Sequence, residues 1–196
     1  MADDAIADDA VADDVVGDGS LTPNALALRM AVVEVERHAS ASGWDQPARL
    51  YALVPTLELA AAEPTLAAEL GITDGTQQPL TPVEQELEED QQSLDDLLGE
   101  IMWPESVVGA LAVVERLVLP PDAEEAVPDD PAEAVAFAAG HPDREDVRIA
   151  VGVLRSGEAH CVLRMRSHDR DDALVHGSDV VPQLVEALRE TLVEED

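Results

Sequence analysis

The chain has 196 residues, an apolar fraction of 46% and a formal net charge of −32. A field of that sign repels nucleic-acid phosphates and anionic lipid headgroups, so we expect neither nucleic acid nor a membrane surface as a partner. Every basic residue is an arginine, which excludes Schiff-base and Walker-type lysine chemistry. The acidity is also consistent with halophilic adaptation.

The chain has one cysteine, Cys161, which excludes an intrachain disulfide and is expected to be an inert core thiol. No apolar run reaches the ~18 residues of a membrane span, and the N-terminus lacks the basic and apolar regions of a signal peptide. The sequence therefore predicts a cytoplasmic protein.

Residues 1–20 repeat the unit ADDAI-ADDAV-ADDVV and contain seven aspartates. A period of five matches neither a helix nor a strand, so no buried face forms. We predict a disordered Asp-rich tail over residues 1–20, followed by a single domain over residues 21–196.

Three sites join a capping side chain to a proline, a pattern typical of helix starts: Thr22-Pro23, Thr81-Pro82 and Asp130-Pro131. The predicted helices run from Pro23 to about Ser42, from Pro82 to about Met102, and from Pro131 to Gly140. Two short helices are expected over residues 56–70, broken at Pro64, and a last helix begins near Ser178 or Asp179.

Strands are predicted at Arg49–Val54 and in the run VVGALAVVERLVLPP, which is apolar at both parities and typical of a central strand. The stretch DVRIAVGVLRSGEAHCVLRMRS predicts a hairpin. A three-residue loop, Arg155–Gly157, places its apolar residues opposite one another and puts Gly157 at the left-handed position of the turn. We predict an α+β fold, a two-layer antiparallel sheet of about four strands backed by helices.

That register places Arg148, His160, Arg164 and Arg166 on one face of the hairpin, with Arg148 directly opposite Arg164. Like charges in that position destabilise a sheet unless an anion lies between them. The anion is either Glu115 or an acidic helix of the same chain, or an anionic ligand or partner that docks there. These five residues, including Glu115, are the candidate anion- or partner-binding site.

The stretch RSHDRDDALVHG offers His168, Asp171 and His176 as weak metal-ligand candidates. Their spacing matches neither H-E-x-x-H nor an EF-hand loop, and a polar surface loop is the simpler interpretation. The sequence contains no nucleophile-elbow, dinucleotide-binding or Walker motif, so we expect no cofactor and identify no catalytic residue.

Four long stretches resemble an uncharacterised family of small acidic actinobacterial proteins: WDQPARLYALVPT, LTPVEQELEE, WPESVVGALAVVERLVLPP and HPDREDVRIAVGVLRSGEAHCVLRMRSHD. The resemblance extends from about Ala25 to Leu192. It implies a cytoplasmic actinobacterial protein and carries no activity, cofactor or site residue.

The sequence therefore favours a non-enzymatic interaction protein, an adaptor or regulatory module, which binds a protein partner or itself. Its docking surface would be the arginine-bearing hairpin face or an apolar helix groove. The alternative is a small hydrolase or metal-dependent enzyme that uses an Arg/Glu cleft around Glu115, Arg148 and Arg164, or the His168–His176 loop.

Overall fold

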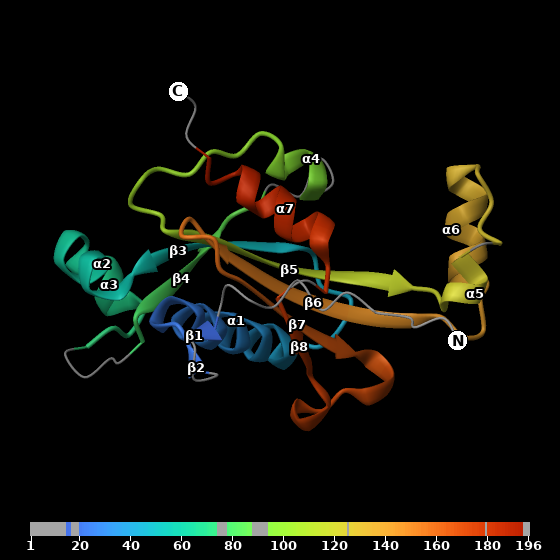
Figure 1. The fold of residues 1–196 in the computed structure, drawn as a ribbon, viewed down its shortest axis with the longest axis horizontal. Helices are drawn as coiled ribbons and strands as arrows, with labels where there is room; N and C mark the ends of the chain where they lie inside the picture. The colour runs from blue at the N-terminus through green and yellow to red at the C-terminus, as the bar shows by residue number, and fades with distance from the viewer. Residues whose placement is uncertain are drawn as a thin grey trace, which may run out of the picture.

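The computed structural model describes residues 15–16, 20–73, 78–87, 94–124, 126–178 and 180–193. Within them, a six-stranded antiparallel sheet has the order β4-β3-β5-β6-β7-β8 (Figure 1). Its strands are β3 (Arg49–Pro55), β4 (Leu80–Gln85), β5 (Gly109–Val118), β6 (Glu145–Leu154), β7 (Ala159–Met165) and β8 (Val175–Gly177). The chain is thus α+β with an antiparallel sheet, and the two edge strands β4 and β8 raise the sheet above the four strands expected.

Helices cover both faces of the sheet, so the prediction of two layers is wrong. The helix α1 (Pro23–Ala41) lies on one face, and α4 (Leu94–Leu98) and α7 (Pro182–Glu190) lie on the other (Figure 1). Two apolar clusters result, one under α1 and one under α4 and α7. A strand that is apolar at both parities needs this arrangement, and Ala110 to Val114 in β5 are buried on both sides.

The start and end of α1 agree with the sequence prediction. The Thr22 hydroxyl accepts a hydrogen bond from the Ala25 amide at 3.0 Å, and Pro23 occupies the first turn, where no amide donor is needed. Gly43, at a φ of +83°, follows the helix end and turns the chain toward β3. The short helices α2 (Thr56–Ala62) and α3 (Pro64–Glu69) are separated at Pro64 as predicted.

The hairpin of β6 and β7 has the predicted register. Val147, Ile149, Val151 and Val153 lie opposite Met165, Leu163, Cys161 and Ala159, and Arg148 lies opposite Arg164. Leu154 and Glu158 close a loop of three residues, and Gly157 has a φ of +107°. The alternation of apolar residues was sufficient to predict this register, because shifting one strand by one residue would move every one of its side chains to the other face of the sheet.

The helix predicted to begin at Pro82 is wrong, because that segment forms the edge strand β4. The Thr81 hydroxyl is 2.9 Å from the Thr56 hydroxyl instead of capping a helix, and Leu80 is buried beside β3. Pro82 is tolerated at the sheet edge, where an amide donor is not needed. Within the predicted span, helix occurs at α4, and residues 88–93 lie outside the described part.

The predicted disordered tail falls largely on residues 1–14 and 17–19, which lie outside the described part. Two short strands, β1 (Val15–Val16) and β2 (Ser20–Leu21), pair with each other just before α1. The C-terminal helix is present as predicted, although it begins at Pro182, a few residues late.

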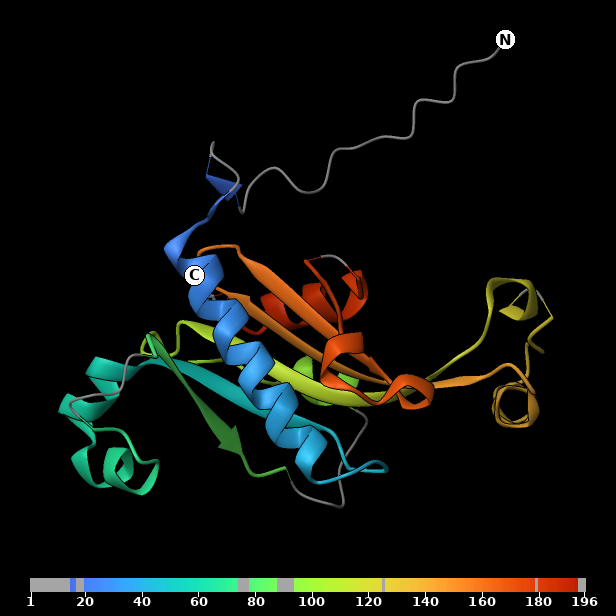
Figure 2. The same ribbon diagram turned by 90° about the horizontal axis from the view of Figure 1, so that it is seen from below.

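Strands β5 and β6 extend as a two-stranded ribbon beyond the body of the sheet. Residues 119–144, here called the arm, join the ends of this ribbon and carry α5 (Pro121–Glu124) and α6 (Pro131–Gly140). In both ribbon views the arm stands apart from α1, α2, α3 and α7 (Figures 1 and 2). None of the helices in the described residues is long and apolar enough to cross a membrane.

Candidate functional site

Arg164 on β7 is held by three carboxylates of the same chain. Its Nε and Nη2 atoms donate to the two carboxylate oxygens of Glu36 at 2.6 and 2.9 Å, and its other bonds reach Asp169 at 3.1 Å and Asp171 at 2.8 Å. Arg164 is 2% exposed and Glu36 is 0% exposed. Such a fork-to-fork pair satisfies both charges, and burial makes each partner depend on the other.

The charge of Arg148 on β6 is neutralised by Glu115 on the neighbouring strand β5. Its Nε and Nη2 atoms donate to one Glu115 oxygen at 3.2 and 2.8 Å, and Nη2 also donates to the Gly43 carbonyl. Glu115 and Arg148 are directly paired across β5 and β6. Arg148 thus has a carboxylate on one side and the like charge of Arg164 on the other, which explains how the sheet tolerates two facing arginines.

The turn after α1 closes over these arginines. The Trp44 ring lies 4.4 Å from the Arg148 guanidinium and 5.5 Å from that of Arg166, and its Nε1 donates to Asp169 at 2.9 Å. The next residue, Asp45, accepts two bonds of 3.0 Å from Arg166. We call this set of residues the arginine cluster: Glu36, Trp44, Asp45, Glu115, Arg148, Arg164, Arg166, Asp169 and Asp171.

Ion pairing shifts the pKa values in the arginine cluster in the directions that keep it charged. Hydrogen bonds to Glu36 raise the pKa of the Arg164 guanidinium. Arg166 lowers the pKa of Asp45, the Trp44 indole lowers that of Asp169, and Arg164 lowers that of Asp171. Arg164, Asp45, Asp169 and Asp171 therefore stay ionised at neutral pH.

The anions that neutralise the facing arginines Arg148 and Arg164 are carboxylates of the same chain, which accept hydrogen bonds from both guanidinium groups. Four of the five candidate residues, Glu115, Arg148, Arg164 and Arg166, are brought together as the sequence analysis expected. Arg148 and Arg164 are buried, and only Arg166 is substantially exposed, at 42% of its side chain. These contacts fasten α1 and the turn after it to the sheet, and they leave the guanidinium groups of Arg148 and Arg164 almost without solvent exposure.

His160, the fifth candidate, lies away from the arginine cluster and contacts His176 of β8. The His160 Nε2 and His176 Nδ1 atoms are 3.4 Å apart, and the ring centroids are 5.6 Å apart. Burial lowers the pKa of His160 to about 4 and also lowers the pKa of His176, with Arg29 adding to both effects. Both rings are consequently neutral at pH 7.

The structure separates the three metal candidates from one another. His168 contacts the Ser167 hydroxyl, Asp171 is bound to Arg164, and His176 faces His160. In the described residues no three His, Cys, Asp or Glu side chains converge on a point where a metal ion could bind.

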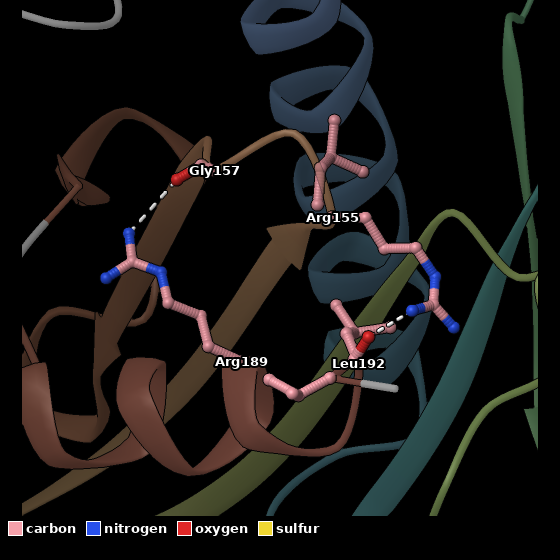
Figure 3. A pocket seen from close by; sticks show the side chains of 6 residues that line it. Arg155, Gly157, Arg189 and Leu192 are labelled. Carbon is pink, nitrogen blue, oxygen red and sulfur yellow. Dashed lines mark hydrogen bonds between the residues drawn. The ribbon is translucent and has the colours of Figure 1, made fainter. Parts of the chain in front are cut away.

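A hollow of about 420 Å³ lies between the β6–β7 turn and the end of α7 (Figure 3). Two arginines line it, but both donate to backbone carbonyls at its rim. Arg155 binds the carbonyls of Trp103 at 2.8 Å and of Leu192, and Arg189 binds that of Gly157 at 3.1 Å. Figure 3 shows the two guanidinium groups turned toward opposite sides, so they fasten the turn to α7.

The arginine cluster buries charged side chains, whereas the main helix of the arm, α6, exposes apolar ones. No residue of α6 is buried, and Val135 is 70% exposed. Phe137, the only phenylalanine of the chain, is half-buried against His141 with a ring separation of 5.7 Å. Leu117 and Val118, at the end of β5 where the arm begins, are exposed as well.

Sequence reasoning missed several residues of the arginine cluster and the character of the arm. Glu36 could have been found, because it continues the i, i+4 row of Leu28 and Val32 on the buried side of α1. Trp44 and Asp45 carry no such signal, since their role depends on the path of the turn. For α6, the sequence AEAVAFAA has no polar face, which predicts that the helix packs against other parts of this chain or against a partner.

The family model of the PPA1309-like proteins matches residues 28–193. The chain belongs to the PPA1309-like protein family, which is uncharacterised. The matched span includes the arginine cluster and the arm, so both lie within the family domain. Comparisons with curated proteins and with solved structures found no match.

Proposed function

We propose that the protein is a non-enzymatic, cytoplasmic interaction module and that the arm is its docking element. Its partner is a protein with an apolar groove bordered by basic side chains. This assignment moves the docking surface from the arginine-bearing hairpin face, favoured by the sequence, to the arm that joins the end of β5 to the start of β6.

The observation that carries the proposal is the exposure of α6. Helices that are apolar on every side are normally buried in a protein core or a membrane. In α6, Glu133 is the only charged residue among ten, yet none of the ten is buried. Exposed apolar surface of this kind marks interaction sites on soluble proteins.

Charge indicates the chemistry of the partner. Residues 119–144 contain seven carboxylates and one arginine, a formal charge of −6 around the apolar helix. A second copy would bring the same charge to the contact, so symmetric pairing of two arms is disfavoured. Basic side chains around an apolar groove would match both features and would also accelerate association with a chain of charge −32.

The residues that could do chemistry are used within the fold. Arg148 and Arg164 are buried and bound to carboxylates of the same chain, and the His168–His176 loop splits into separate contacts. This distribution supports an interaction role over the hydrolase or metal-dependent enzyme considered from the sequence.

The test compares two matched apolar-to-charged substitutions at exposed positions. Val135→Asp alters the arm, and Leu57→Asp alters α2, where Leu57 is 84% exposed. Full-length proteins carrying each change, and the wild type, are used as bait in lysate of the source cells. Proteins bound by the wild type and Leu57→Asp but lost with Val135→Asp are purified, and their affinity is measured by titration.

We expect at least one such protein, with a basic groove, a dissociation constant raised more than about tenfold by Val135→Asp, and affinity that falls with salt. Sedimentation of the purified chain alone identifies the competing occupant. A dimer that Val135→Asp dissociates would show that the arm binds a second copy, and identical recovery by both variants would contradict the arm as docking element.

A further inference from the structure

The helix α1 exposes a short apolar row on the side that faces away from the sheet. Leu26 is 49% exposed and Met30 is 41% exposed, and Val33 beside them is half-buried. In Figure 2, α1 crosses in front of the sheet and no other described element lies over it. Leu28 and Val32, both 0% exposed, already pack α1 on the sheet, so the outer row is not needed to anchor the helix. A contiguous exposed apolar row is a feature of interaction surfaces.

The spacing of this row is that of a coiled-coil seam. Leu26, Met30 and Val33 are separated by four and then three positions, which corresponds to the d, a and d positions of a heptad. Because a helix has 3.6 residues per turn, Arg29 and Glu34 lie on opposite sides of the row, at the g and e positions. Side chains at these two positions determine which partner and which orientation a helix pair accepts.

The two flanking charges are available to a second molecule. Arg29 and Glu34 are both exposed, and within the described part of the chain neither of them forms an ion pair. Arg37 occupies the next seam position, so the apolar seam ends before it and its long side chain extends to solvent. The row therefore has an apolar centre with one positive and one negative side.

The outer side of α1 is also the helix surface on which two copies of this acidic chain repel each other least. Its exposed Arg and Glu side chains are two arginines and one glutamate, a formal charge of +1: Arg29, Glu34 and Arg37. Every other α-helix of the described chain carries a net negative charge. Two chains of charge −32 therefore meet with less like-charge repulsion at α1 than at any other described helix.

We propose that the protein forms a parallel dimer through α1, in which Leu26, Met30 and Val33 contact the same three residues of a second copy. A two-fold axis along the helix pair places Arg29 of each copy beside Glu34 of the other. In an antiparallel pair, Arg29 would face Arg29 and Glu34 would face Glu34. The charges therefore favour the parallel orientation.

The dimer has a consequence for docking but does not depend on it. The arm stands apart from α1 in both ribbon views, so a dimer formed through α1 presents two free arms (Figures 1 and 2). Two arms on one particle bind a partner that has two grooves more tightly than a single arm does, through effective concentration. The α1 dimer forms whether or not the arm binds a partner.

The experiment measures self-association of the full chain by sedimentation at about 0.15 M salt, where the Debye length is about 8 Å and long-range repulsion is screened. We expect an equilibrium between monomer and dimer that depends on concentration. Arg29→Glu and Glu34→Arg each place like charges at both contacts, so either variant alone should dimerise at least about tenfold more weakly. An equimolar mixture of the two variants should regain the affinity of the wild type, because opposite charges then meet at both contacts.

Substitutions of apolar residues locate the contact. Met30→Asp, at the centre of the seam, should abolish dimerisation. Leu57→Asp in α2 and Val135→Asp in the arm, at other exposed apolar positions, should leave it unchanged. All of these positions are exposed, and thermal melts check that each variant is folded.

Three results would overturn the proposal. The wild type could stay monomeric at every concentration, the dimer could persist in Met30→Asp, or the mixture of Arg29→Glu and Glu34→Arg could fail to dimerise. A dimer that Val135→Asp dissociates would assign self-association to the arm and would also overturn it. The lysate comparison of Val135→Asp with Leu57→Asp tests the arm separately, so failure of one proposal is distinguishable from failure of the other.

Discussion

The arginine cluster and the arm lie at different places along the same two strands, and each reverses the usual distribution of side chains. In the cluster, charged groups are buried: Arg164 is 2% exposed and Glu36 is 0% exposed. In the arm, an apolar helix has no buried residue. The cluster's charges find their partners inside the fold, whereas no side chain of α6 is buried against the rest of the described chain.

The contrast separates the residues that stabilise the fold, in the arginine cluster and the sheet, from the residues that would contact a partner, in the arm. Substitutions in the cluster or the sheet should change the stability of the isolated chain. Equivalent substitutions in the arm should leave stability nearly unchanged and act on binding. Each of the first three predictions below pairs a change in one region with a matched change in the other or at the surface.

The largest effect is expected from Glu36→Ala, which leaves Arg164 buried beside two partly exposed aspartates. Loss of one partner of a buried ion pair costs about 3–5 kcal/mol of unfolding free energy. Urea unfolding followed by circular dichroism measures the loss.

Two further variants show where that loss comes from. Arg166→Ala, at an exposed ion pair, should cost no more than about 1 kcal/mol. Glu36→Met combined with Arg164→Met should recover most of the stability, because no buried charge is left alone. Equal losses for Glu36→Ala and Arg166→Ala would show that burial does not strengthen the dependence on this pair.

Gly109→Ala should cost about 3 kcal/mol, because overpacking a core is destabilising. An added Cβ would lie 2.4 Å from the backbone oxygen of Val153, an atom that cannot move without shifting β6. Gly140 in the arm has nothing within 4 Å of the same atom, so Gly140→Ala should be neutral or slightly stabilising. Thermal melts of both variants make the comparison, and a destabilised Gly140→Ala would place the arm in a packed environment.

Val151→Ala and Val135→Ala remove the same two methyl groups from the body and the arm. Val151 is 0% exposed between β5 and β7, so its truncation should cost about 2 kcal/mol. Val135 is 70% exposed, and its truncation should change the unfolding free energy by less than about 0.5 kcal/mol. Chemical denaturation distinguishes the two, and similar losses would contradict an unpartnered α6.

The smallest effect is expected from acid. Asp169 and Asp171 have pKa values below the ordinary 3.8, so they favour folding while ionised. This contribution is complete above about pH 5 and is lost as the pH falls through their folded-state pKa values. Unfolding midpoints between pH 5 and pH 2.5 should therefore fall less steeply in Asp171→Asn than in the wild type. Parallel curves for the two proteins would show that Asp171 does not contribute to the loss of stability in acid.

Local sequence patterns predicted the parts of the fold whose partners are near in sequence. The β6–β7 register, including Arg148 opposite Arg164, followed from alternation because one face had to be apolar. The Thr81-Pro82 pair gave a helix signal that was overridden when β3 offered an edge for pairing. Trp44 and Glu36 reach the arginines through turns and packing that no local pattern contains.

For the arm, the sequence predicted α6 correctly but not its surroundings. The helix has the expected bounds, Pro131–Gly140, with Asp130 accepting hydrogen bonds from the first-turn amides. The sequence shows that α6 has no polar side. Only the structure shows that the ribbon of β5 and β6 holds α6 away from the sheet, where nothing in the body of the described chain covers it (Figure 2). The position of an element, more than its type, makes it a docking surface.

The central claim is that the arm, and not another exposed apolar position, contacts a partner. Site-specific photo-crosslinking in the source cells tests it directly, with the photoreactive residue at position 135 of the arm or at position 57 of α2. We predict one discrete adduct, with a basic protein, from position 135 and none from position 57. The same adducts from both positions, or none from position 135 while the protein is folded, would contradict the account.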